Sequence, residues 1–445
     1  MANLIIGHVS TTSARIWVRG DKKSGAARLR YRTAGSQPWQ TTSAIPLLEH
    51  RGYVAVEELT NLAPATRYEC ELSYQKGQGG SRGSFTTAPA QPREICFLLG
   101  SCNLTRLPFG IKRPEPAWER IGQLATAQQA DFMIHCGDQI YADLPSMPLL
   151  PDLGFYRKQY QAAWKRPPTA SVLANLPHYM IMDDHEIFDG FANDEKFVGR
   201  PSQGVRDVAL AAYREYQHSH NPQTFPAPAL YYSFGFGGAE FFVLDVRTER
   251  YRHNGAQMIS SMQMNRFKSW LLRHAGKPKF VVSSIPFVSE VRDADDKWCG
   301  EAFRAQREEI IDLLAQLEID RVVFLTGDMH CSYHATLNVS SPTGRRFTVH
   351  ELMSSPINQF ASGLHAFADD PAGTTPANAT YDAQLSPDEF YGAHSNVMAV
   401  RLSTDGVVSY SIFRTKSDGP AALRGEFQLE LLAPELRRTA SAPAA

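Results

Sequence analysis

Two different hydrophobic patterns divide this chain near residue 90. Before that point, short segments alternate apolar and polar residues and are separated by Gly, Pro and Ser, which is typical of strands with one buried face. The strands expected there are 13–18, 27–32, 53–58, 68–75 and one ending near 87. Beyond residue 90, apolar runs alternate with stretches of helical period. The pattern therefore predicts a β-rich segment followed by an α/β layered domain.

The second segment can be divided into elements by the period of its apolar residues. Continuous apolar runs predict buried strands at 95–99, 132–134, 179–182, 241–244, 280–283, 322–325 and 349–353. Amphipathic spacing predicts helices at 117–129, 156–164, 206–218, 263–274 and 303–317. Residues 359–394 are rich in Ala, Asp, Pro, Gly and Thr and predict a long loop, either a lid over a site or a poorly ordered excursion. Three further strands are expected to close the sheet, at 397–402, 407–413 and 427–432.

The β-rich segment contains a recognisable corner. Residues 62–68, LAPATRY, resemble the tyrosine corner of fibronectin type III domains, in which the Tyr hydroxyl binds the backbone a few residues upstream. Residues 88–92, APAQP, have the composition of a linker. We predict a fibronectin type III-like β-sandwich over 1–90, a catalytic domain over 91–435 and a flexible tail over 436–445. The expected role of the sandwich is structural, with adhesion or carbohydrate binding as the alternative.

Composition narrows the class of protein. The chain has 445 residues, 43% of them apolar and 20% charged, with a net charge of -1, so it predicts a globular protein without a nucleic-acid-binding surface. It has no apolar run of about 18 residues, so no membrane span is expected. The first residues lack the features of a signal peptide, which favours a cytoplasmic location, or a secreted or periplasmic one if the numbering begins after processing. Its six cysteines form no CxxC pair, which argues against a disulfide framework or a zinc ribbon.

Polar residues follow five of the predicted strands. They are Gly100-Ser101-Cys102-Asn103, Gly137-Asp138-Gln139-Ile140-Tyr141, Asp183-Asp184-His185-Glu186, Asp245-Val246-Arg247 and Thr326-Gly327-Asp328-Met329-His330. The ends of strands in a parallel-type sheet converge on one edge. A gathering of Asp, His, Cys and Tyr indicates metals rather than a Ser-His-Asp triad, since a carboxylate can bridge two cations and a phenolate can bind ferric iron.

Taken in this order, GSCN, GDxxY, DDHE and GDxH resemble the motifs of the calcineurin-like metallophosphoesterases, and within them the alkaline phosphatase D (PhoD-like) family. The resemblance covers nearly the whole chain. It implies a layered β-sheet core flanked by helices and a first metal, ferric iron, held by Cys102, Asp138, Tyr141 and His330. Thiolate and phenolate ligands both suit iron, and charge transfer from phenolate to iron gives such sites a violet or purple colour.

The resemblance also implies a second metal that shares Asp138 and is held by Asp184 and Asp328. Asp184 stands where the superfamily usually has Asn, and Asp328 stands where it usually has His. Ser284 occupies the position of a further His ligand. Ligation by oxygen alone favours a hard cation, so Ca²⁺ is expected, with Mg²⁺ or Mn²⁺ as alternatives.

His185 follows Asp184 and is expected to face the leaving group. The resemblance implies that this His is a general acid or a phosphate ligand, and the pKa of imidazole suits proton transfer near neutrality. Asp183 or Glu186 is expected to orient its ring.

Two further residues are candidates for contact with phosphate. Asn103 follows the Cys ligand and can donate an amide hydrogen bond. Arg247 can supply a charge-assisted contact, with a salt bridge to Asp245 or Glu249 as the alternative.

The function expected from these residues is hydrolysis of small phosphate monoesters by attack of a metal-bound hydroxide on phosphorus. A phosphodiesterase or phospholipase D-like hydrolase with the same site is the alternative within this chemistry. A different class is also considered, namely a non-catalytic metal-bound scaffold whose β-sandwich binds a partner.

Overall fold

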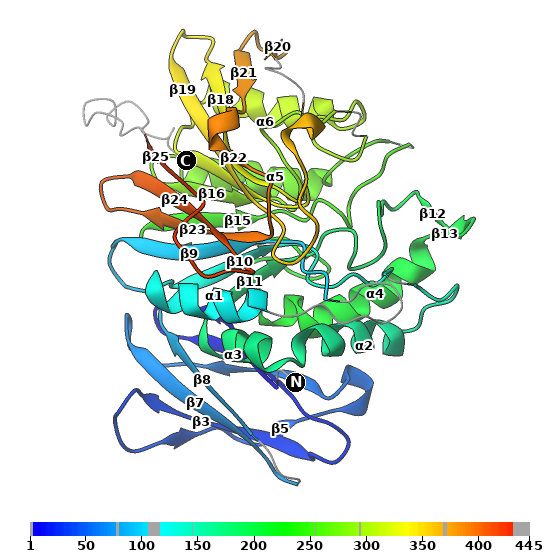
Figure 1. Cartoon of the computed structure of the whole chain (residues 1–445), viewed down its shortest axis with the longest axis vertical. Coiled ribbons are helices and arrows are strands. Elements are labelled where there is room, and N and C mark those ends of the chain that lie inside the picture. The colour runs from blue at the N-terminus through cyan, green and yellow to red at the C-terminus, as the bar shows by residue number, and fades with distance from the viewer. Residues whose placement is uncertain are drawn as a thin grey trace, which may run out of the picture.

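The computed structural model describes residues 3–76, 80–105, 116–144, 146–253, 255–292, 295–367 and 372–429. The expected tail at 436–445 and the end of the expected strand 427–432 lie outside these ranges. Figure 1 shows the N-terminal strands at one end of the molecule and the larger α/β part beyond them.

The N-terminal strands form a β-sandwich of two antiparallel sheets. One sheet has the order β1 (Leu4–Val9), β2 (Ala14–Arg19), β6 (Val54–Leu59). The other has the order β4 (Gln40–Thr41), β3 (Ala26–Thr33), β7 (Arg67–Tyr74), β8 (Ser81–Thr86), with β5 (Ile45–Pro46) paired to β3. The Tyr68 hydroxyl accepts a hydrogen bond from the backbone N–H of Ala63 at 2.8 Å. This contact is a tyrosine corner, and the sandwich is fibronectin type III-like as expected.

A six-stranded sheet forms the first layer of the α/β part within the described residues. Its order is β11 (His178–Ile181), β10 (Phe132–Cys136), β9 (Ile95–Gly100), β23 (Asn396–Leu402), β24 (Val407–Arg414), β25 (Leu423–Gln428). The strands β9, β10 and β11 run parallel, and β23 pairs with β9 in the antiparallel sense.

A nine-stranded sheet forms the second layer. Its order is β14 (Tyr232–Phe236), β15 (Ala239–Val243), β16 (Lys279–Val282), β17 (Val322–Thr326), β19 (Arg346–Ser354), β18 (Ser332–Ser340), β21 (Thr380–Gln384), β20 (Ala372–Thr374), and β22 (Phe390–Tyr391) also pairs with β18. The strands β20, β21 and β22 belong to the segment 359–394, so the expectation of a loop without structure there was wrong. These strands are short, but pairing to the long strand β18 stabilises two of them.

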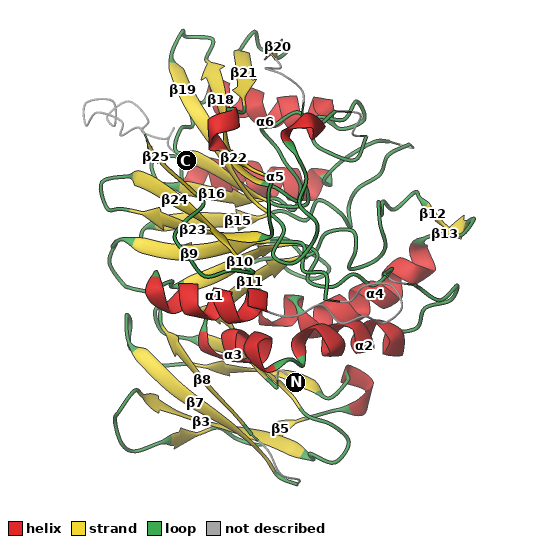
Figure 2. Ribbon diagram, viewed as in Figure 1, coloured by secondary structure: helices red, strands yellow, loops and turns green. Residues whose placement is uncertain are grey.

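Helices flank the two sheets (Figure 2). Near the six-stranded sheet and the sandwich lie α1 (Pro116–Ala127), α2 (Leu153–Trp164), α3 (Pro167–Asn175) and α4 (Gln203–Tyr216). Against the nine-stranded sheet pack α5 (Ser261–Arg273) and α6 (Arg304–Gln316). In the described ranges, no helix combines the length and apolar content that crossing a membrane requires.

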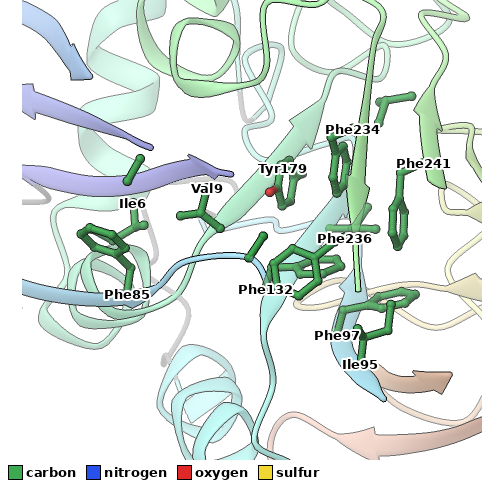
Figure 3. Close-up of a cluster of buried hydrophobic side chains, with 14 of the residues drawn as sticks. Ile6, Val9, Phe85, Ile95, Phe97, Phe132, Tyr179, Phe234, Phe236 and Phe241 are labelled. Carbon is green, nitrogen blue, oxygen red and sulfur yellow. The ribbon is translucent and has the colours of Figure 1, made fainter. Parts of the chain in front are cut away.

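The two large sheets pack face to face through aromatic rings. The Phe97 ring centroid lies 5.2 Å from that of Phe132 in the same sheet and 5.7 Å from that of Phe241 in the other. Figure 3 shows that this cluster continues through Val9 to Phe85 of the sandwich. The sandwich therefore shares a continuous apolar core with the α/β part, which supports the structural role expected of it.

The chemistry-bearing strand ends come from these two sheets, not from one sheet edge as expected. The strands β9, β10 and β11 belong to the six-stranded sheet, whereas β15 and β17 belong to the nine-stranded sheet. Because the sheets face each other, the loops that follow their strands can still meet at one end of the sandwiched layers.

Candidate metal centre

Two glycines allow four loops to approach closely. Gly137 precedes Asp138 at φ +92°, and a Cβ there would lie 2.4 Å from the Cβ of Asp183. Gly327 precedes Asp328, and a Cβ there would lie 2.5 Å from the Ser101 hydroxyl oxygen. Any larger residue at either position would separate the loops. The Gly-Asp pairs of the sequence therefore reflect packing between strand ends as well as chemistry.

Several candidate ligands have an unusual backbone conformation. Twelve non-glycine residues among those described have positive φ, and four of them are candidate metal ligands. These four are Cys102 (φ 59°), Asp138 (φ 55°), Asp328 (φ 74°) and His330 (φ 55°). Residues held in this sparsely populated region cluster at functional sites. The backbone thus indicates the same centre as the side chains.

The four residues predicted for the first metal lie together. The Cys102 sulfur lies 3.4 Å from an oxygen of Asp138, and the Tyr141 hydroxyl lies 3.5 Å from Nε2 of His330. Cys102 and Tyr141 are in contact within one small buried cluster. The structure therefore places the thiol beside the carboxylate and the phenol beside the imidazole, and the contact between Cys102 and Tyr141 connects the two pairs.

Burial disfavours the charged forms of three of these donors, and the positive charges nearby do not offset it. Burial, followed by the nearby Asp328 carboxylate, raises the pKa of Cys102 to about 12. Burial also raises the pKa of Asp138 and of Tyr141 well above their ordinary values. The oxygen Oδ1 of Asp138 is buried and has no hydrogen-bond partner among the described residues. Because a bound cation would let these groups ionise and would satisfy that oxygen, the residues fit a metal.

The residues predicted for the second metal also converge. Oxygens of Asp183, Asp184 and Asp328 lie within 4.8 Å of one another. Asp184 belongs as well to a group with Asp138 and His185 that meets the same limit. Asp184 is therefore a member of both groups. The predicted ligands Asp138, Asp184 and Asp328 all offer carboxylate oxygens, which a hard cation prefers. The sequence did not assign Asp183 to this group.

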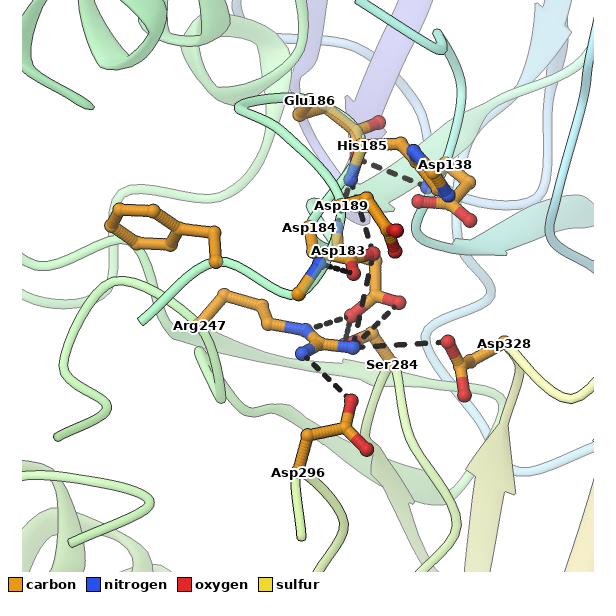
Figure 4. Close-up of polar contacts among 12 residues, drawn as sticks. Asp138, Asp183, Asp184, His185, Glu186, Asp189, Arg247, Ser284, Asp296 and Asp328 are labelled. Carbon is orange, nitrogen blue, oxygen red and sulfur yellow. Dashed lines mark hydrogen bonds and ion pairs between the residues drawn. The ribbon is translucent and has the colours of Figure 1, made fainter. Parts of the chain in front are cut away.

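Ser284 and Arg247 hold Asp183 in place. The Ser284 hydroxyl donates to Asp183 at 2.6 Å, so the residue that stands in place of the usual His supports a carboxylate. Arg247 is fully buried and forms a two-pronged ion pair with Asp183, and it also lies 3.4 Å from Asp296. Figure 4 shows the guanidinium between these carboxylates, with Asp328 to one side.

The expected salt-bridge partners of Arg247 were wrong. Asp245 accepts a hydrogen bond from the backbone N–H of Arg247, and the guanidinium pairs with other carboxylates. Within the described chain Glu249 is not an ion-pair partner of Arg247 either; it binds the Gln263 amide. The expected contact between Arg247 and phosphate stays a prediction, and in this arrangement the side chain neutralises buried acids.

His185 is oriented by Asp143. The ring Nδ1 lies 2.8 Å from one oxygen of Asp143, whereas we expected Asp183 or Glu186 to be the partner. Burial opposes a charged ring, but Asp138 and the hydrogen bond to Asp143 outweigh it and raise the pKa of His185 well above its usual value. A protonated imidazole beside the carboxylate cluster can act as an acid. Asp143 ends the stretch HCGDQIYAD, so a second acid five residues after Asp138 was the available signal in the sequence.

Glu186 has a different role from the one expected. Its buried carboxylate accepts the backbone N–H groups of Asp138 at 3.0 Å, Gln139 at 2.7 Å and Asp183 at 2.9 Å, and the Gln217 amide at 2.9 Å. These bonds join the loops that follow β10 and β11. Glu186 therefore fixes the position of Asp138, and it does not contact His185 through its side chain within the described residues.

Asn103 and the other histidines complete the description. Asn103 is fully buried, its oxygen accepts from the Trp118 indole at 3.2 Å, and its Nδ2 has no partner among the described residues. A free amide donor next to a metal ligand supports the expected hydrogen bond to phosphate. Four other buried histidines form two pairs, His135 with His178 at 2.8 Å and His334 with His350 at 3.0 Å, as expected of structural residues.

Comparison with known proteins identifies the family of this chain. A solved structure described as that of PhoD superposes with a TM-score of 0.73 at 18% identity, over 97% of this chain and 90% of that chain. Alkaline phosphatase D of Bacillus subtilis (strain 168) is 25% identical in an alignment of length 379 that covers 74% of this chain and 62% of that protein. The chain thus spans less than two thirds of the length of this relative. The family model described as PhoD-like phosphatase matches residues 110–407, well over half of the sequence. This chain therefore belongs to the PhoD-like phosphatase family.

Proposed function

We propose that this protein is a metal-dependent phosphoesterase that hydrolyses phosphate monoesters. The observation that carries the proposal is the convergence of Asp138, Asp184 and His185 within 4.8 Å, beside the buried thiol of Cys102. Hydrolysis of this kind needs carboxylates that hold the cations and a proton donor for the leaving group. Asp138 and Asp184 can supply the first, and His185 can supply the second. Membership of a phosphatase family supports the same reaction class.

Iron is proposed for the first site and calcium for the second, with Mg²⁺ or Mn²⁺ as alternatives for the latter. The proposed iron ligands are Cys102, Asp138, Tyr141 and His330, and the proposed calcium ligands are Asp138, Asp184 and Asp328. The contacts among the thiol, carboxylate, phenol and imidazole support the first assignment. The group of carboxylates supports the second. When bound, such cations polarise phosphoryl oxygens and make water a better nucleophile.

The side chains of the chain itself have separate roles in this proposal. His185 gives a proton to the departing alkoxide oxygen, and Asp143 holds the ring so that Nε2 faces away from the carboxylate. The free amide of Asn103 donates to a phosphoryl oxygen. Arg247 keeps Asp183 and its neighbours from repelling one another and thereby preserves the shape of the site.

The colour of the protein tests the first metal. Tyr141→Phe should abolish the visible charge-transfer band of the iron-loaded protein, because that band needs a phenolate on the iron. The fold should be retained, since only one hydroxyl is removed. Absorption spectra and far-UV circular dichroism of the wild type and the variant provide the measurement. A colourless wild type that contains iron, or a band that survives the substitution, would disprove the ligand assignment.

The proposed reaction is tested by comparing nitrophenyl phosphate with bis(nitrophenyl) phosphate. We expect the metal-loaded protein to hydrolyse the monoester with the higher kcat/KM. A higher value for the diester would favour the phosphodiesterase alternative. Failure to hydrolyse either ester, with both metals bound, would favour the non-catalytic scaffold.

A further inference from the structure

A second buried cation lies beside the candidate calcium ligands. Lys297 belongs to the segment between β16 and α6, is only 8% exposed, and its Nζ lies 2.7 Å from an oxygen of Asp328. The same ammonium lies 2.7 Å from an oxygen of Asp296. Asp296 in turn contacts Arg247 at 3.4 Å and Arg250 at 3.8 Å. Positive and negative side chains therefore alternate from the buried arginines through Asp296 to Lys297, which contacts the candidate ligand Asp328.

The backbone on both sides of this ammonium is fixed. Trp298 is fully buried, donates to the Ser283 hydroxyl at 3.2 Å, and has its ring centroid 5.5 Å from that of Phe287. The backbone carbonyl of Asp296 accepts from Arg250 at 2.9 Å. Both neighbours of Lys297 are anchored, and its ammonium is held by two carboxylates. The side chain therefore loses little conformational entropy when it binds an anion.

The ammonium lies on the side of the centre proposed for calcium. Asp328, which it contacts, forms one group with Asp183 and Asp184.

The Lys297 ammonium has one more N–H donor than it has carboxylate partners. A lysine ammonium has three N–H donors. Within the described ranges, its polar partners are the carboxylates of Asp296 and Asp328. Arg247, the other buried cation here, has no exposed surface and is held by Asp183. Lys297 is therefore better placed than Arg247 to meet an anion that enters the site.

We propose that Lys297 binds a phosphoryl oxygen of the substrate and gives the site a preference for the dianionic phosphate group of a monoester over the monoanionic group of a diester. This inference rests on the proposed function and names its substrate class. A fixed positive charge attracts a dianion more strongly than a monoanion, and a diester has one fewer free oxygen for the remaining N–H. Asp296 acts as a positioning residue for the ammonium.

The test compares phosphate binding by three variants of the metal-loaded protein. Lys297→Met removes the charge and keeps the length of the side chain, whereas Lys297→Arg keeps the charge. Lys268→Met is the matched control, because Lys268 also pairs with a carboxylate, Glu309, but lies at the surface of α5. Calorimetric titration with inorganic phosphate and with dimethyl phosphate measures both affinities, and elemental analysis measures the bound metals.

We expect Lys297→Met to weaken the binding of inorganic phosphate by about ten- to a hundredfold, the usual effect of losing a hydrogen bond to a charged group. The affinity for dimethyl phosphate should fall much less, and Lys297→Arg should restore part of the loss. The metal content of all variants and both affinities of the control should match the wild type. In kinetics, the ratio of kcat/KM for monoester to diester should fall in Lys297→Met.

Two results would overturn the inference. One is an unchanged affinity of Lys297→Met for inorganic phosphate with both metals bound. The other is a loss of metal in that variant with no difference between the two phosphate probes, which would mean that Lys297 only holds Asp328. Because the titrations do not depend on turnover, a wild type that binds phosphate but hydrolyses no ester would refute the proposed function and leave the inference supported.

Discussion

Asp138→Asn is expected to lower kcat/KM for a phosphate monoester on the order of 10³-fold or more and to deplete both metals together. The reason is that Asp138 lies between the two groups of ligands, close to Cys102 on one side and to Asp184 and His185 on the other. A neutral amide donates with its nitrogen and cannot bridge two cations as a carboxylate does. Activity and elemental analysis on the same preparation provide the measurement.

Asparagine is the appropriate replacement because it isolates the charge. Asp138 has φ 55°, a conformation that Asn tolerates and that Ala does not favour. The matched control is Asp207→Asn, an exposed carboxylate on α4 whose partner is the adjacent Arg206. If Asp138→Asn loses one metal and retains the other at full occupancy, the two sites do not share this residue.

His185→Ala is expected to slow an alkyl phosphate ester far more than a nitrophenyl ester. A strongly basic alkoxide must be protonated as it leaves, whereas nitrophenolate needs little help. General acid catalysis typically contributes 10²–10⁴-fold, so we expect the two losses to differ by roughly a hundredfold. The metal content should stay near that of the wild type, because His185 is not among the proposed ligands. The measurement is kcat/KM for both esters, with metal analysis.

Asp143→Asn provides an independent check of the same step. The amide keeps the size of the side chain but removes the carboxylate that raises the pKa of His185. The variant should therefore show the same bias toward good leaving groups, to a smaller degree. Equal losses on both esters in His185→Ala would make the ring a phosphate-binding residue, and a loss of metal would make it a ligand.

Local pattern predicted most of the fold, and its failures have physical causes. The strand β1 was not predicted because five of its six residues are buried, which removes the alternation that marks a strand. The helix α3 was not predicted because it begins with two prolines, which usually mark a loop. Proline is tolerated in the first turn of a helix, where a backbone N–H would have no acceptor within the helix. The strands within 359–394 form because β18 offers a long edge for pairing, which local composition does not reveal.

For the site, the motifs named Asp138, Asp184 and Asp328 as candidate ligands but not Asp183, and the contacts between loops could not be predicted. The Gly-Asp pairs and the Asp-Asp-His-Glu motif identified Asp138 and Asp184, which the structure brings together. The pairing of His185 with Asp143 and of Asp183 with Arg247 joins residues 42 and 64 positions apart. The first pair joins loops that follow neighbouring strands of one sheet, and the second joins loops of two sheets that face each other, and no single strand end encodes either arrangement.

The central claim is that hydrolysis depends on metals held by this cluster of acids. The most direct measurement is monoester hydrolysis by protein stripped with chelators and then reloaded with iron, calcium, both or neither, with a visible spectrum of each sample. We expect the metal-free protein to be inactive, iron to restore the visible band, and iron together with a hard divalent cation to restore activity. Full activity of the metal-free protein, or recovery with Zn²⁺ alone, would contradict this claim.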